Sequence, residues 1–232
     1  VDEDAVYDHV GTAEHKAVAK EAAARSFTLV KYDNAAPLTG QKIVVAGSLA
    51  QNIRALNSGW TAKEPIEITG TTILDAKAGA DNVTYVETAA DVPADLSGTT
   101  AIVVVGEKSG THDPEWTAAS LEFPQEQTEL VQALKAAGAN VVSVVIMNRA
   151  YVLTPISDAS DSVLLVYRPG ITCGAEAVAD ALFGETAITG KLPFQIPADM
   201  EQVLNQREDM PKDIENPLYD YGFGIETESF GA

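Results

Sequence analysis

Residues 99–115 read TTAIVVVGEKSGTHDPE and indicate a strand that ends in an acidic loop. The apolar, β-branched run from Ile102 to Val105 is short and continuous, as in the strands of parallel sheets that are buried on both faces. Gly106 ends this run, and polar residues follow it. Open α/β sheets bind their ligands beyond the carboxyl ends of their strands, so we expect this loop to lie at the functional edge of a sheet.

Strands and helices alternate along the rest of the chain. Further buried strands are predicted at 43–46, 141–146 and 163–166, and shorter ones at 27–31 and 82–87. This alternation predicts an open, mostly parallel, doubly wound sheet of about six strands with helices on both faces. The predicted helices run from Thr12 to about Ser26, from Thr71 to Ala80, over 124–137 and over 174–183.

Residues that begin and end helices support these assignments. Thr12 and Thr71 are placed to act as N-caps, and Gly138 and Gly184 are placed to end helices. Prolines beyond residue 191 exclude long regular elements there. We therefore expect a linker at 1–14, an α/β-sandwich domain at 15–190, and an irregular C-terminal extension at 191–232 that packs on the same domain.

The charge of the chain excludes some classes of partner. Its 232 residues carry 34 Asp and Glu against 15 Lys and Arg, a net charge of -19, which argues against nucleic acids and anionic membranes. A strongly acidic surface keeps a protein soluble and is typical of proteins in salty or extracellular surroundings, so it is compatible with an extracellular or periplasmic parent. The chain begins at Val1 without Met or a signal peptide, so we expect a fragment of a longer protein. Cys173, the single cysteine, allows no disulfide within the chain, and we expect it to be a small buried residue.

Four loops are expected to meet at the carboxyl edge of the sheet, at 47–60, 106–115, 147–150 and 168–170. Their side chains suit a neutral polyol, because carboxylates and amides bind hydroxyl groups and an aromatic ring stacks on the face of a sugar. The candidate substrate-binding residues are Trp60, Arg149 and Glu107. Two of these residues have an alternative role that remains open. The alternative for Trp60 is packing in the core, and the alternative for Arg149 is a surface ion pair.

Other kinds of site find little support in the sequence. The three histidines are scattered without ligand spacing, so no metal is expected. The first βα turn lacks the G-x-G-x-x-G pattern, and neither a P-loop nor a G-x-S-x-G nucleophile elbow occurs. We therefore expect no cofactor.

Taken in order, many segments of the chain resemble the C-terminal domain of family 3 glycoside hydrolases, the β-glucosidases and exo-1,3/1,4-β-glucanases. The segments that carry this resemblance are Val10–Lys20, Ser26–Lys31, Ile43–Gly47, Ser58–Thr61, Gly70–Leu74, Gly106–Glu107, Ala181–Gly184, Thr189–Pro193 and Pro217–Gly224. In that family an α/β-sandwich domain follows a TIM-like barrel. The barrel carries the aspartate nucleophile, and the sandwich supplies the general acid/base from the loop after a Gly-Glu strand end, which here is Gly106-Glu107.

The resemblance implies that this chain is part of a retaining β-glycosidase. Its partner would be the N-terminal barrel, and its substrate a β-linked gluco-oligosaccharide. A barrel of ~250 residues does not fit within this chain beside the predicted sheet, and the family's Ser-Asp-Trp-like nucleophile motif is absent. We therefore expect this chain to be inactive alone.

The acid/base is expected within 112–115. Alignment from Gly106 places His112 at the family's position, and alignment back from the Pro124 helix start places Pro114 there, beside Glu115. We predict Glu115 first, Asp113 second and His112 third, because glutamate has the longer reach and proline stiffens the loop. The alternative is that all three are solvated loop residues.

Two other functions remain open. One is a non-catalytic structural or glycan-binding module of the same fold. The other is an unrelated flavodoxin-like binder of small molecules, for which the ordered segment matches would be coincidental.

Overall fold

The computed structural model describes residues 5, 8–33, 38, 41–57, 70–107, 120–207 and 209–227. At its centre lies an open six-stranded sheet with the strand order β1-β6-β5-β4-β2-β3. The strands are β1 (Thr28–Tyr32), β2 (Lys42–Ala46), β3 (Val83–Val86), β4 (Thr99–Gly106), β5 (Asn140–Ile146) and β6 (Ser162–Leu165). All neighbouring pairs are parallel except β1 with β6. The predicted open, mostly parallel sheet is therefore confirmed.

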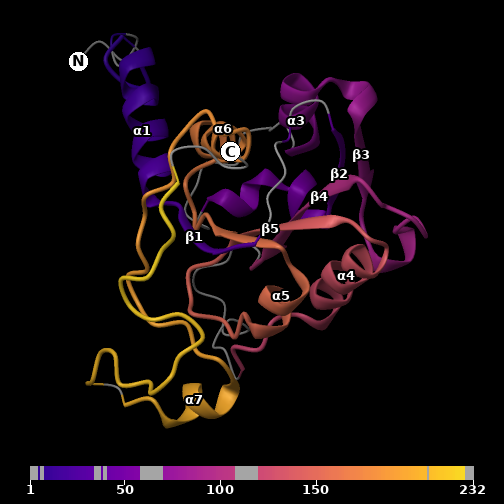
Figure 1. Cartoon of the computed structure of the whole chain (residues 1–232). Coiled ribbons are helices and arrows are strands. Elements are labelled where there is room, and N and C mark those ends of the chain that lie inside the picture. Colours follow the sequence, from indigo (N-terminus) through magenta and orange to yellow (C-terminus); the bar gives the residue numbers. More distant parts are fainter. Residues whose placement is uncertain are drawn as a thin grey trace.

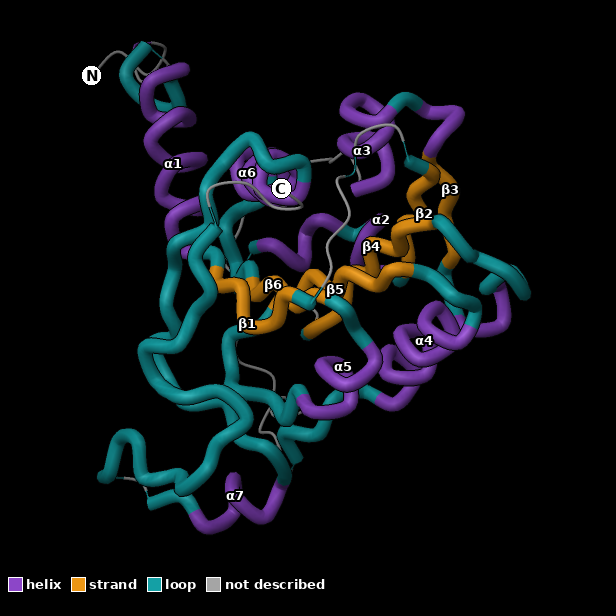
Figure 2. Tube along the Cα trace, in the orientation of Figure 1, coloured by secondary structure: helices purple, strands orange, loops and turns teal. Residues whose placement is uncertain are grey.

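Helices cover both faces of this sheet, as predicted (Figure 1). The helices are α1 (Ala13–Ser26), α2 (Ser48–Gln51), α3 (Gly70–Ala78), α4 (Gln125–Ala136), α5 (Thr154–Ala159), α6 (Thr172–Leu182) and α7 (Met200–Asn205), with short 3-10 turns η2 (Ile53–Leu56), η3 (Ala80–Asn82) and η4 (Ala89–Asp91). Figure 2 shows α1, α2, α3 and α6 on one side of the strands and α4 and α5 on the other.

Strand β4 shows why the central strands are mainly apolar. Ile102 belongs to the core on the α3 and α6 side. Its neighbours Val103 and Val105 belong to the core on the α4 side, with Leu134. Successive side chains of a strand point to opposite faces, and both faces here are covered, so both sets of positions favour apolar residues.

The order of the strands places a topological switch point between β2 and β4. Strand β2 pairs with β3 on one side and with β4 on the other. The chain from β2 to β3 carries α3 on one face, and the chain from β4 to β5 carries α4 on the opposite face. The direction of winding therefore reverses between β2 and β4, and such a switch point is where open α/β sheets bind ligands.

The helix ends agree with the sequence at one predicted cap and differ at the other. Thr12 caps α1, because its side chain accepts a hydrogen bond from the backbone N–H of His15. The prediction for Thr71 was wrong: α3 begins at Gly70, so Thr71 lies inside the helix. Helices α2, α5 and α7 were not predicted, because four to six residues are too few to show a 3.6-residue period.

Three isolated bridges hold the chain beyond α6, and one of them reaches the sheet. Ile188 pairs with Thr227, Ile196 with Tyr219, and Ile225 with Leu29 of β1. Within the described part of 191–232, α7 is the one α-helix. The division into a linker at 1–14, a sandwich domain at 15–190 and an extension at 191–232 stays a prediction.

No described helix has the length and apolar character needed to cross a lipid bilayer.

Candidate functional site

The carboxyl end of β4 approaches β5 so closely that only glycine fits there. Gly106 has a φ of 136°, and a Cβ atom on it would lie 1.9 Å from the carbonyl oxygen of Ile146. The next residue, Glu107, donates its backbone N–H to that same oxygen at 2.9 Å. Glu107 is therefore placed at the carboxyl edge of the sheet by the pairing of β4 with β5.

Gln127 of α4 fixes the other side of the β4 end. Its Oε1 accepts a hydrogen bond from the Gly106 N–H at 2.7 Å, and its Nε2 donates to the Gly106 carbonyl oxygen at 2.9 Å. The register of β2 with β4 ends where Ala46 meets Val103. The Gln127 amide thus takes the place of a neighbouring strand beyond the end of β2.

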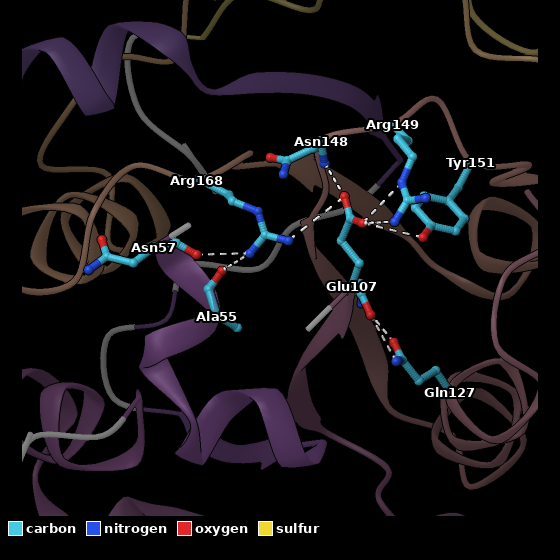
Figure 3. Close-up of polar contacts among 9 residues, drawn as sticks. Ala55, Asn57, Glu107, Gln127, Asn148, Arg149, Tyr151 and Arg168 are labelled. Carbon is cyan, nitrogen blue, oxygen red and sulfur yellow. Dashed lines mark hydrogen bonds and ion pairs between the residues drawn. The ribbon is translucent and has the colours of Figure 1, made fainter. Parts of the chain in front are cut away.

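The Glu107 side chain is only 3% exposed, and protein donors surround its carboxylate (Figure 3). Oε1 accepts a hydrogen bond from the backbone N–H of Asn148. Oε2 accepts bonds from Arg149, at 2.8 Å from Nη2 and 3.3 Å from Nε, and from the Tyr151 hydroxyl at 3.4 Å. Glu107 therefore ties the end of β4 to the loop after β5.

Arg168 extends this cluster to a third segment. Its Nη2 lies 3.8 Å from Oε1 of Glu107, and its side chain is 8% exposed. Its Nη1 donates to the carbonyl oxygens of Ala55 and Asn57, the latter at 3.1 Å. Arg168 follows β6, so this cluster joins the carboxyl ends of β4, β5 and β6 to the end of η2 (Figure 3).

The ionisation of these groups follows from burial and from the Glu107 charge. The hydrogen bond to Glu107 raises the pKa of Arg149. Burial lowers the pKa of Arg168, although the Glu107 charge opposes that effect. Burial, aided by the Glu107 charge, raises the pKa of the Tyr151 hydroxyl, so the phenol stays protonated at neutral pH.

The structure brings together two of the residues selected from the sequence. Glu107 and Arg149 form an ion pair at 2.8 Å, and Arg149 keeps 29% of its side chain exposed. Trp60, His112, Asp113 and Glu115 lie outside the described residues, so their roles stay predictions.

Sequence reasoning missed Gln127, Tyr151 and Arg168 as members of the site. A signal existed for Arg168, because it follows a predicted buried strand at the expected edge. Gln127 and Tyr151 carry no comparable signal, because their contacts depend on how α4 and the β5 loop pack. Among the described side chains, no group of three or more His, Cys, Asp and Glu residues is arranged to hold a metal ion.

Comparison with known proteins identifies the family. Residues 27–227 match the profile of the "Glycosyl hydrolase family 3 C-terminal domain". Among curated relatives, β-glucosidase C of Emericella nidulans is 32% identical over 121 residues, which are 52% of this chain and 19% of that protein. A β-xylosidase of Formosa agariphila is 27% identical over an alignment of 253 positions, gaps included, which covers 95% of this chain and 35% of the relative.

Solved structures agree with this assignment. An exo-1,3/1,4-β-glucanase from a Pseudoalteromonas species is 27% identical, with a TM-score of 0.75 over 94% of this chain and 29% of the glucanase. A β-glucosidase from Listeria innocua shares the fold at 21% identity, with a TM-score of 0.76 over 94% of this chain and 34% of that one. The chain thus spans roughly a fifth to a third of these relatives. It belongs to the C-terminal domain family of the family 3 glycosyl hydrolases.

Proposed function

We propose that this chain is the C-terminal domain of a retaining β-glycosidase that hydrolyses O-glycosyl bonds in β-glucosides or β-glucans. In this proposal it completes the active site of an N-terminal TIM-like barrel and supplies the general acid/base. The observation that carries the proposal is the family match over residues 27–227, together with relatives named as β-glucosidases and β-xylosidases, of which the matched segments cover 19% and 35%.

The chemistry requires two carboxyl groups on either side of the scissile bond. Retention needs them about 5 Å apart, one attacking the anomeric carbon and the other protonating the leaving oxygen. In the proposal the barrel provides the nucleophilic aspartate. This chain provides the acid from Glu115, with Asp113 and His112 as alternatives, in the segment that follows Glu107 in sequence.

The described side chains have a supporting part in this proposal. Arg149 is partly exposed at the carboxyl edge, where its guanidinium can donate to sugar hydroxyls, and Glu107 holds its orientation through two hydrogen bonds. Trp60 is proposed to stack on a sugar ring. Because the Glu107 carboxylate is buried among protein donors, its orienting effect on Arg149 is better supported than direct contact with substrate.

One observation favours a second candidate, a structural or glycan-binding module without catalysis. The two alignments of the acid/base position place His112 or Pro114 there, and neither is a carboxylic acid. A module of this kind would keep the fold and the Arg149 site and would lack a proton donor.

The isolated chain is the first test. Removal of one member of a cooperating carboxylate pair typically costs several orders of magnitude in rate, so the 232-residue chain should hydrolyse no aryl β-glucoside above background. Robust turnover by the purified chain, with contaminating glycosidase excluded, would show that the nucleophile lies within it.

The second test uses the parent protein with its barrel. Glu115→Ala should slow substrates with poor leaving groups far more than activated aryl glycosides, and added azide should rescue the activated ones. Glu126→Ala, at an exposed position in the first turn of α4, serves as the matched control. Equal losses on both substrate classes, or no loss on either, would assign the acid elsewhere or favour the module without catalysis.

A further inference from the structure

Arg168 is a buried cation that contacts two separate segments beside the candidate site. Its side chain is 8% exposed, it lies 3.8 Å from the Glu107 carboxylate, and it donates to the carbonyl oxygens of Ala55 and Asn57. Desolvating a guanidinium is costly, and a well-packed apolar residue could often replace it without loss of stability. Its presence at this edge therefore calls for an explanation other than stability.

The segments that Arg168 joins are the ones that lead into the predicted site residues. Asn57 is followed in sequence by the segment that contains Trp60, and Glu107 by the segment that contains Asp113 and Glu115. One guanidinium thus fixes the relative positions of the two chain segments from which these residues depart.

The residue before Arg168 has a strained backbone. Tyr167 has a φ of 55°, a left-handed conformation that a bulky residue rarely adopts. Its hydroxyl lies 2.9 Å from Oγ1 of Thr28 in β1, which holds the ring against the sheet. Such strain persists only where the surroundings enforce it, and it is concentrated at functional sites.

We propose that Arg168 is a positioning residue, which acts through Glu107 to hold the β4, β5 and η2 ends in their catalytic arrangement. This inference rests on the proposed glycosidase function. Glu107 transmits the effect, because one of its oxygens faces Arg168 and also accepts from the Asn148 N–H, while the other holds Arg149. Arg168 itself needs no contact with substrate.

The first experiment examines this coupling in the chain by itself. Arg168→Lys keeps the positive charge and loses the planar fork that reaches Glu107 and two carbonyl groups together. We expect amide hydrogen exchange at Asn148 and Asn57 to become at least about tenfold faster, since local opening there becomes easier. The matched control is Arg25→Lys, at a side chain that is 76% exposed and pairs with Glu21, and it should leave both amides unchanged.

A folding check keeps this experiment interpretable. Far-UV circular dichroism establishes that each variant is folded. If Arg168→Lys does not fold, Glu107→Gln replaces it and exchange is compared at Asn57 alone, because glutamine removes the charge that faces Arg168, whereas Asn148 donates directly to Glu107. Unchanged exchange at the compared amides in a folded variant would overturn the inference.

The second experiment measures catalysis in the full-length parent. A displacement of about 1 Å can cost roughly 10²-fold in rate. Arg168→Lys should therefore lower kcat about 10- to 100-fold on substrates with poor leaving groups and change KM less than about threefold. Activated aryl glycosides should lose less, and Arg168→Met should lose more than Arg168→Lys on both classes. Losses that are equal for all substrates would indicate a purely structural role and would overturn the inference.

The two experiments separate the two proposals. A wild-type parent that is inactive on every β-glycoside would refute the proposed function, whereas the exchange result would still decide whether Arg168 couples the segments.

Discussion

Substitution of Gly106 by alanine tests whether the close approach of β4 and β5 holds the site in place. A Cβ atom at Gly106 would lie 1.9 Å from the carbonyl oxygen of Ile146 and 2.7 and 2.8 Å from its carbonyl carbon and nitrogen. These are backbone atoms of a central strand. The carbonyl oxygen also accepts the Glu107 N–H at 2.9 Å, so Ile146 cannot move away without weakening that bond.

Two effects set the size of the loss. A non-glycine residue in a sparsely populated backbone region costs about 1–3 kcal/mol. Forcing an extra methyl group into a close-packed region costs a further 1–3 kcal/mol or so. The free energy of unfolding should therefore fall by about 2–6 kcal/mol, a large share of the roughly 5–15 kcal/mol that a native domain typically has.

Urea unfolding of the isolated chain measures this loss. With a slope of about 2–3 kcal/mol per molar, the midpoint should fall by roughly 0.7–3 M for Gly106→Ala, with an unchanged slope. Gly98→Ala is the matched control, because Gly98 also has a positive φ, 73°, while no atom lies within 4 Å of its Cβ position. Its cost should be the conformational penalty alone, about 1 kcal/mol.

Equal midpoint shifts for the two variants would refute this reasoning. That result would mean that β4 and β5 can separate at little cost, and that the position of Glu107 does not depend on their contact.

Two further predictions concern stability elsewhere in the fold. Leu134 is fully buried in α4, so Leu134→Ala should lower the free energy of unfolding by about 2–5 kcal/mol. Val18 is 66% exposed, so Val18→Ala should change it by less than about 0.5 kcal/mol. Thermal unfolding of both variants checks this contrast, and similar melting temperatures would contradict it. Burial by itself raises the pKa of Asp180, but the hydrogen bonds from Lys20 and Lys77 lower it by more. The pKa of Asp180 therefore lies below its ordinary value. The ionised Asp180 therefore stabilises the fold above the ordinary aspartate range, near pH 4, and loses that contribution as the pH falls through its folded-state pKa. Asp180→Asn should accordingly lower the free energy of unfolding by about 1 kcal/mol at pH 7 and by progressively less below about pH 4. Urea titrations of both proteins at several pH values measure this, and a stability difference that is constant with pH would rule out the linkage.

The sequence by itself determined the architecture of the sheet. The runs at 43–46, 102–105 and 141–146 lie in parallel strands, and the run at 163–166 overlaps β6 up to Leu165, which pairs in parallel with β5. They could be recognised because a strand buried on both faces is apolar at nearly every position, and that constraint is local; the buried Ser143 of β5 is an exception, and its hydroxyl pairs with that of Ser160. Gly138 and Gly184 follow α4 and α6 for an equally local reason, since the chain there adopts a positive φ.

The tertiary structure decided how those elements pair and what meets at their ends. The antiparallel direction of β1 follows from the path of the chain around β6, and no local period records it. Glu107 and Arg149 could be assigned to one edge because each follows a predicted strand. The contacts of Arg168 with Glu107 and with Ala55 could not be predicted, because they join residues that lie far apart in the sequence. Arg168 and Ala55, for example, are 113 positions apart. A periodic pattern encodes which face of an element is buried, whereas the partner of a polar side chain depends on the three-dimensional path of the whole chain.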